Sequence, residues 1–261
     1  MNKICFVLDS HYPNYTKRLR DNILKSFIDL KLYNYDFGLL ISTNRPYDFS
    51  DIVCPNFYVY DIDELRKNSE FSIKYEILPI NPQGIYPSKF PWNLERFILK
   101  KAGELGYNYV INLDSDVVLN YVTTGEQLYE LLNRLYVENT LATNQALFYY
   151  TEESQNEIFY LHKKYIDHFN LKYNIDDYTT LDGPVLVYMG KTSNDIINFA
   201  NKWDEFVDFG YRKQYGFGYE NIVCGNWSLV IPQVGFKLKW MELPFIPHHK
   251  YEDRYWLWLV Y

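Results

Sequence analysis

The chain has 261 residues, with 26 Lys and Arg against 33 Asp and Glu, so its formal net charge at pH 7 is −7. Hydrophobic residues make up 48% of the sequence and charged residues 23%, which excludes disorder for most of the chain and predicts a folded core. The acidic balance argues against general nucleic-acid binding, because that function normally requires a basic face.

The first half alternates short apolar runs, which are typical of buried strands, with segments of helical spacing. The predicted strands are residues 4–9, 37–42, 57–62 and 109–113. The predicted helices are residues 15–32 and 92–105, and Gly106 ends the second one. Residues 80–91 are rich in proline and are predicted to form a loop. This βαβ rhythm predicts a mainly parallel sheet with helices on both faces.

The second half of the sequence is less regular. The predicted elements there are helices at 126–136, 152–169 and 194–209, and strands at 185–187 and 236–240. Because no repeat, low-complexity tract or linker separates the halves, we expect one domain over residues 1–261.

The cysteines and apolar segments indicate the compartment. Cys5, Cys54 and Cys224 are far apart, so we expect neither a disulfide framework nor a zinc–thiolate site, and we expect a cytoplasmic location. The apolar run at 4–8 is too short for a signal peptide, and no transmembrane segment is predicted. The aromatic tail at 255–261 is expected to dock on its own domain, with a partner, an oligomer or a membrane surface as alternatives.

The segment Asp114-Ser115-Asp116 immediately follows the predicted strand at 109–113. In open parallel sheets, ligands bind just beyond the carboxyl ends of the strands. Two carboxylates one residue apart repel each other unless a cation lies near them. Carboxylate oxygens suit Mg²⁺ or Mn²⁺, which can in turn bridge a diphosphate. Asp114 and Asp116 therefore predict a divalent metal site.

Residues 92–116 form an ordered pattern around this acid pair. A helix carries Arg96 and ends with Ala102 and Gly106, and an aromatic residue, an apolar strand and the Asp-x-Asp motif follow. This pattern resembles the glycosyltransferases of the GT-A fold, which use nucleotide sugars. The resemblance implies an α/β, Rossmann-like GT-A domain whose mainly parallel sheet is flanked by helices. It also implies that residues 1–120 bind the nucleotide and residues 121–261 bind the acceptor and the donor sugar.

The resemblance implies roles for single residues as well. In that class the acid pair binds a divalent metal that holds the diphosphate, usually of UDP, and the first strand with its loop holds the base. It therefore implies a nucleotide site formed by these residues: Leu8, Asp9, Ser10, Arg96 and Asp114. The expected cofactor is Mn²⁺ or Mg²⁺, and the expected donor is a UDP-sugar.

Residues 215–221, Tyr-Gly-Phe-Gly-Tyr-Glu-Asn, are similar to a segment of the galactosyl- and N-acetylgalactosaminyltransferase-like branches. Those branches carry a late His that completes the metal site, which implies that His248 or His249 binds the metal; the sequence does not choose between them. An imidazole ligand favours Mn²⁺ over Mg²⁺. Lys250 either neutralises phosphate or is simply solvated.

The acceptor hydroxyl must lose a proton or be held by a carboxylate. Glu220 in this similar segment and Asp182 in a glycine turn are the two catalytic candidates. Their alternatives are binding of the donor sugar or acceptor, a helix cap for Glu220 and a turn residue for Asp182. Asn221 stands where inverting members often carry the base, so either Glu220 acts or the resemblance implies a retaining enzyme.

The expected function is metal-dependent transfer of a sugar from a UDP-sugar to a hydroxyl of a glycan, lipid, protein or modified nucleobase. The net charge of −7 disfavours a nucleic-acid acceptor. Two alternatives stay open. A haloacid-dehalogenase-like phosphatase also carries Asp-x-Asp after a buried strand, although on its first strand. A non-catalytic sugar-binding module is supported by the aromatic content of 19%.

Overall fold

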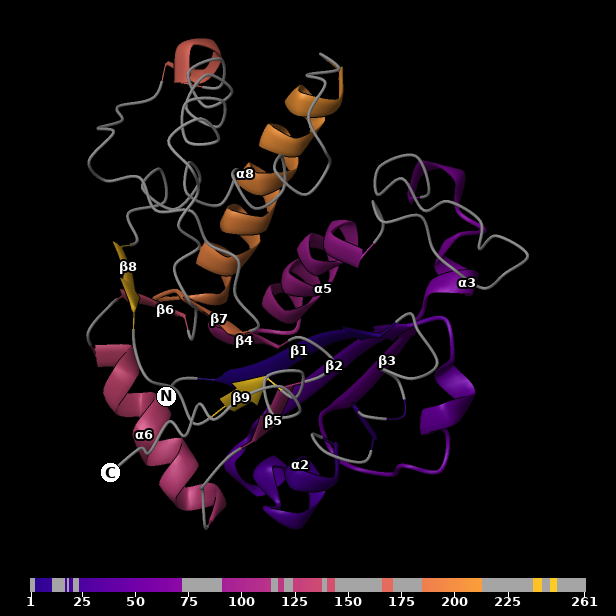
Figure 1. Ribbon diagram of the computed structural model, residues 1–261, viewed down its shortest axis with the longest axis vertical. Helices are drawn as coiled ribbons and strands as arrows, with labels where there is room; N and C mark the ends of the chain where they lie inside the picture. Colours follow the sequence, from indigo (N-terminus) through magenta and orange to yellow (C-terminus); the bar gives the residue numbers. More distant parts are fainter. Residues whose placement is uncertain are drawn as a thin grey trace.

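The chain adopts an α/β fold built on a seven-stranded sheet with the strand order β3-β2-β1-β4-β7-β6-β8 (Figure 1). A second sheet pairs β5 with β9. The computed structural model describes residues 3–10, 17, 19–20, 24–71, 91–113, 117–119, 124–137, 140–143, 166–170, 185–212, 237–240 and 245–247. The predicted class, α/β with a mainly parallel sheet flanked by helices, is confirmed.

One half of the large sheet is entirely parallel. Its strands are β1 (Ile4–Ser10), β2 (Gly38–Thr43), β3 (Phe57–Asp61) and β4 (Tyr109–Leu113). The other half consists of β7 (Val185–Met189), β6 (Thr140–Thr143) and β8 (Lys237–Trp240). Because β7 is antiparallel to both β4 and β6, and β6 is parallel to β8, β7 runs against the other described strands of this sheet.

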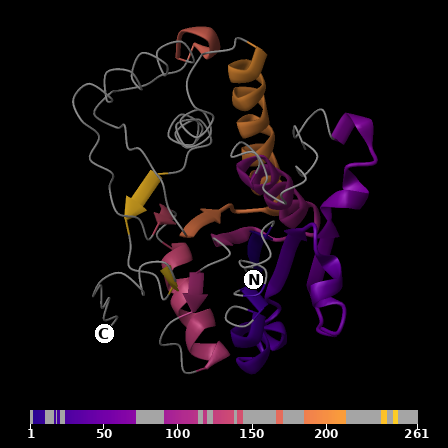
Figure 2. The same cartoon turned by 45° about the vertical axis from the view of Figure 1, so that its right-hand side comes forward.

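Alternate residues of the central strands enter two different cores. Ile4, Phe6 and Leu8 of β1 belong to the core under α2 (Lys25–Asp29) and α6 (Gly125–Val137). On the opposite face, α5 (Pro91–Glu104) lies against β1, β2 and β4, and α8 (Ser193–Arg212) lies against α5, β4 and β7. Figure 2 shows these two helix layers on either side of the sheet. A strand buried on both faces needs the continuous apolar run that the sequence shows.

Two glycines define how α5 ends and how closely it packs. Gly106 has φ +91°, and the N–H of Tyr107 donates to the carbonyl of Ala102 at 3.0 Å, which closes the helix. The predicted end of this helix is therefore confirmed. A Cβ at Gly103 would lie 2.7 Å from Cγ1 of Ile197, so this glycine allows the close contact of α5 with α8.

Asn108 ties together the amino ends of the central strands. Its side-chain oxygen accepts from the N–H of Lys3 at 2.8 Å, and its amide donates to the carbonyl of Gly190 at 2.9 Å. The hydroxyl of Tyr136 in α6 donates to the same carbonyl at 2.7 Å. This network joins the segments before β1 and β4, the end of β7, and α6 at one edge of the sheet.

The sequence missed the shortest elements and overextended one helix. The missed strands have three or four residues: β5 (Val117–Leu119), β6 and β9 (Phe245–Pro247). The predicted helix at 15–32 contains α2, but a 3₁₀ turn, η2 (Leu32–Tyr35), begins at its last residue. Other short helices are η3 (Pro46–Phe49) and α3 (Ile62–Leu65). Of the predicted helix at 152–169, the described part, 166–169, is helical. The predicted loop at 80–91 lies outside the described residues, apart from Pro91, which begins α5.

None of the helices in the described part of the chain combines the length and the hydrophobicity that crossing a lipid bilayer requires.

Cys5 and Cys54 are free thiols. Burial raises the pKa of the Cys5 thiol well above its usual value, so this side chain behaves as a small apolar core residue. The third cysteine, Cys224, and the aromatic tail at 255–261 lie outside the described residues.

Candidate active site at the carboxyl edge of the sheet

The strand order reverses next to β1. From β1 the chain moves outward to β2 and β3, and then crosses to the other side of β1 to form β4. In open α/β sheets, ligands bind in the crevice at the carboxyl ends of the strands where such a reversal occurs. The register pairs Leu8 of β1 with Leu113 of β4, and the next residues in the sequence are Asp9 and Asp114. The reversal therefore lies where the predicted site residues begin.

The carboxyl ends of β1 and β2 are fixed to each other. Asp9 and Ser10 pair with Ser42 and Thr43. The Thr43 hydroxyl donates to the carbonyl of Ser10 at 2.7 Å, and it accepts from the N–H of Arg45 at 3.0 Å. Ser10 is 1% exposed. These contacts give the end of β1 a defined backbone position next to β4.

Leu8 is fully buried, with its side chain in the core under α2 and α6. It therefore helps to place the backbone of Asp9 and Ser10 through packing. A contact of Leu8, Asp9 or Ser10 with a uracil base stays a prediction.

Most of the other predicted site residues lie outside the described part of the chain. They are Asp114, Asp116, Asp182, Glu220, His248, His249 and Lys250. The structure does describe the strands on either side of the acid pair, because β4 ends at Leu113 and β5 begins at Val117. Among the described residues alone, no group of three or more His, Cys, Asp and Glu side chains is arranged to hold a metal ion.

The small sheet connects the acid-pair segment with the late part of the chain. β5 and β9 are antiparallel, and Val117 pairs with Pro247. Val117 follows Asp116 in the sequence, and Pro247 precedes His248 and His249. β5 and β9, which are far apart in the sequence and which adjoin the predicted metal ligands, are therefore hydrogen-bonded neighbours.

Arg96 of α5 forms a buried ion pair with Asp204 of α8. The distance between Nη1 and the Asp204 Oδ1 is 3.1 Å, and the side chains are 1% and 10% exposed. This pair joins the two helices that cover β1 and β4, so Arg96 has a structural role. Its predicted contact with a nucleotide is not among the described interactions and stays a prediction.

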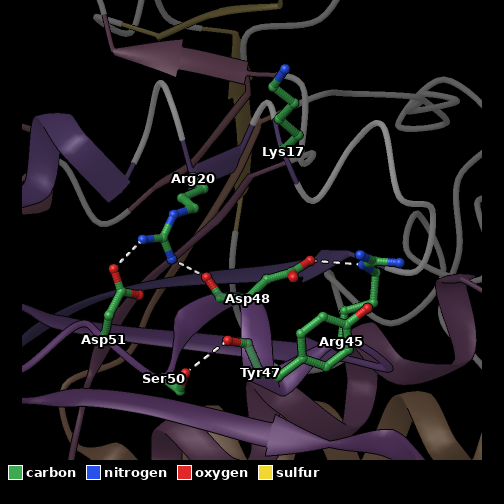
Figure 3. Close-up of a pocket in the computed structure, with 7 residues that line it drawn as sticks. All are labelled: Lys17, Arg20, Arg45, Tyr47, Asp48, Ser50 and Asp51. Atoms are coloured by element: carbon green, nitrogen blue, oxygen red, sulfur yellow. Dashed lines mark hydrogen bonds and ion pairs between the residues drawn. The ribbon is translucent and has the colours of Figure 1, made fainter.

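A pocket of about 560 Å³ lies beside these strands (Figure 3). Its charged and aromatic lining consists of Lys17 and Arg20, which follow β1, and Arg45, Tyr47, Asp48 and Asp51, which follow β2. Because β1 and β2 are parallel, the segments that follow them leave the sheet at the same edge. This pocket was not predicted from the sequence. The available signal was the polar segment directly after the predicted strand at 37–42.

Ion pairs hold the lining of this pocket in place. Arg20 pairs with the carboxylate of Asp51 and donates to the carbonyl of Asp48. The hydrogen bond that Arg20 donates to the Asp51 carboxylate lowers the pKa of Asp51. Nε of Arg45 donates to the Asp48 carboxylate at 2.7 Å, which raises the pKa of Arg45. The Arg45 guanidinium also lies 5.0 Å from the centre of the Tyr47 ring.

No family model matches the chain, and no curated protein matches it.

The buried pair leads to a stability prediction. Asp204→Ala removes the carboxylate that faces the buried Arg96, and losing one partner of a buried pair typically costs ~3–5 kcal/mol. We expect urea denaturation to show a free energy of unfolding that is lower by this amount. The matched control is Glu205→Ala, because Glu205 forms a surface pair with Lys202 at 2.7 Å and its side chain is 56% exposed. That control should cost less than ~1 kcal/mol. Equal losses in the two variants would show that the buried pair has no special role.

Proposed function

We propose that the chain is a metal-dependent glycosyltransferase of the GT-A fold that transfers a sugar from a UDP-sugar to a hydroxyl acceptor. The observation that carries the proposal is the position of Asp114-Ser115-Asp116. In the sequence the motif is the three residues between β4 and β5, and β4 itself lies beside the reversal of strand order at β1. An acid pair at this point of an open sheet is suited to a cation that holds a diphosphate.

The pairing of β5 with β9 supports a shared metal site. Asp116 and His248 are each one peptide bond from a residue of the Val117–Pro247 pair, and consecutive Cα atoms are about 3.8 Å apart. The acid pair and the two histidines therefore adjoin, in the sequence, two strands that pair with each other. Two carboxylates with one imidazole form a donor set that suits Mn²⁺, so Asp114, Asp116 and one of the histidines fit that ion. When bound, the ion would stabilise the negative charge on the leaving diphosphate.

The remaining residues have distinct proposed tasks. The end of β1, with Asp9 and Ser10, offers a fixed backbone edge against which the base can bind. Lys250 would neutralise phosphate charge. Glu220 would hold the acceptor hydroxyl or accept its proton, and Asp182 is the second candidate for that role.

The phosphatase alternative has weaker support. In that family the acid motif follows the first strand, where the catalytic aspartate needs to lie. Here the motif follows β4, and β1 ends in Asp9-Ser10. Placement after β4 favours a cation-binding role for the motif.

The first test of the proposal is metal dependence. UDP should bind at least about tenfold more tightly with Mn²⁺ than with EDTA, a difference of ~1.4 kcal/mol or more, measured by calorimetry. Asp116→Ala should remove this difference, because it removes a proposed ligand. The control is Asp167→Ala, an exposed acid in the helical segment 166–169. Equal UDP affinity of the wild-type protein with and without metal would refute the proposal.

The two histidines should not be equivalent. Neighbours in an extended chain point to opposite sides, and β9 is extended up to Pro247, so only one of them should face the metal. One of His248→Ala and His249→Ala should abolish Mn²⁺-stimulated UDP binding while the other leaves it nearly unchanged. His168→Ala, at an exposed position, is the control. If both histidine variants keep full stimulation, the segment after β9 does not contribute a ligand.

Glu220→Gln tests the proposed carboxylate. A residue that orients the acceptor or takes its proton should lose at least about 100-fold in turnover, with UDP binding retained. A helix cap would instead cost ~0.3–1 kcal/mol of stability and leave turnover almost intact. Glu130→Gln, on the exposed side of α6, is the matched control in transfer and denaturation assays. Near-normal turnover in Glu220→Gln would move the role to Asp182.

A further inference from the structure

We propose that the pocket between the segments after β1 and β2 binds a neutral carbohydrate residue. Its volume of about 560 Å³ lies within the range of ~300–1,000 Å³ that is usual for small-molecule sites. The lining side chains come from two separate stretches of chain. Figure 3 shows Arg20, Arg45, Tyr47, Asp48 and Asp51 near one another, with Lys17 farther away.

The charges of the lining select the class of ligand. The pocket contains three cations, Lys17, Arg20 and Arg45, and two carboxylates, Asp48 and Asp51. An anionic ligand would meet both carboxylates, and a cationic ligand would meet all three cations. A hydroxyl group both donates and accepts hydrogen bonds, so a neutral polyol can use both kinds of side chain.

The ion pairs orient these groups and still leave donors and acceptors for a ligand. Arg45 uses its Nε for Asp48, so its two terminal nitrogens remain able to donate. The Asp51 side chain is 65% exposed although one of its oxygens accepts from Arg20. Pre-oriented charged groups bind a hydroxyl with a smaller loss of side-chain entropy than freely rotating groups.

Tyr47 supplies an apolar surface next to these polar groups. It is 60% exposed, an unusually open position for a large aromatic ring in this structure. The C–H groups on one face of a sugar ring can pack against such a ring while its hydroxyls reach the charged side chains. A pocket for phosphate alone would gain nothing from the exposed ring.

The pocket lies at the same edge of the sheet as the proposed donor site. The inference therefore deepens the proposed function and rests on it in one respect: in a glycosyltransferase, the bound residue would be a distal sugar of the acceptor glycan. Without transfer activity, the same pocket would make the chain a sugar-binding module.

The test measures saccharide binding by the full chain in EDTA and without nucleotide, so its outcome does not depend on the donor site. The probes are the methyl glycosides of glucose, galactose, mannose and N-acetylglucosamine, with maltotriose and chitotriose, observed by saturation-transfer NMR. We expect at least one probe to bind. Tyr47→Ala and Asp51→Ala should each weaken that binding at least tenfold, whereas Tyr47→Phe should retain it.

The control variant is Val53→Ala, because Val53 is 97% exposed and does not line the pocket. It should bind the probe as the wild-type protein does. The proposal is wrong if none of the probes binds, if binding survives Tyr47→Ala, or if inorganic phosphate binds at this pocket and the sugars do not. If a sugar binds as expected but UDP binding is independent of metal, the carbohydrate pocket stands and the transferase proposal falls.

Discussion

The pairing of β1 on both of its edges determines where the rest of the molecule can place its polar residues. β1 is hydrogen-bonded to β2 on one edge and to β4 on the other, and its residues from Ile4 to Leu8 are at most 3% exposed. Its polar residues, Asp9 and Ser10, come only at its carboxyl end. The segments that follow β1, β2 and β4 all start at one edge, because the three strands are parallel. Segments from distant parts of the sequence therefore begin side by side at that edge.

Arginine–aspartate pairs have two different roles around this edge. The pair of Arg96 with Asp204 is buried, and it joins α5 to α8 above the central strands. The pair of Arg20 with Asp51 is open to solvent, and it adds little to stability. What the open pair provides is a fixed direction for two charged groups at the pocket. The buried pair therefore has a structural role, whereas the exposed pair is accessible to a ligand.

Long apolar runs, and glycine at the end of a helix, made most of the fold predictable from the sequence. The strand at 109–113 has the predicted bounds, and Gly106 ends α5 because its positive φ suits glycine. β5 and β9 were not predictable, because three residues are too few to show a period and each strand depends on its distant partner. The partner of Arg96 was hidden for the same reason. A sequence shows which residues carry charge, but pairing across helices depends on tertiary packing.

Only the part of the candidate site whose residues are adjacent in the sequence was predictable. The acid pair stands out because its residues and the strand before it are adjacent in the sequence. The pocket did not stand out, because Lys17 and Arg20 join Arg45 and Asp48 only once β1 and β2 are paired. Polar residues in two separate segments form no recognisable sequence motif, so the sequence does not show that folding will bring them together.

The small β5–β9 sheet has a consequence for the proposed metal site. Each strand has only three residues, and an isolated two-stranded ribbon of this length is at best marginally stable in water. The strands connect directly to the acid pair on one side and to the two histidines on the other. A cation bound by both segments would favour the paired state by its binding free energy, since it cannot be held in the same way when the strands are apart. On the proposed function, metal binding and the pairing of β5 with β9 are therefore one coupled equilibrium, and the late part of the chain joins the donor site through it.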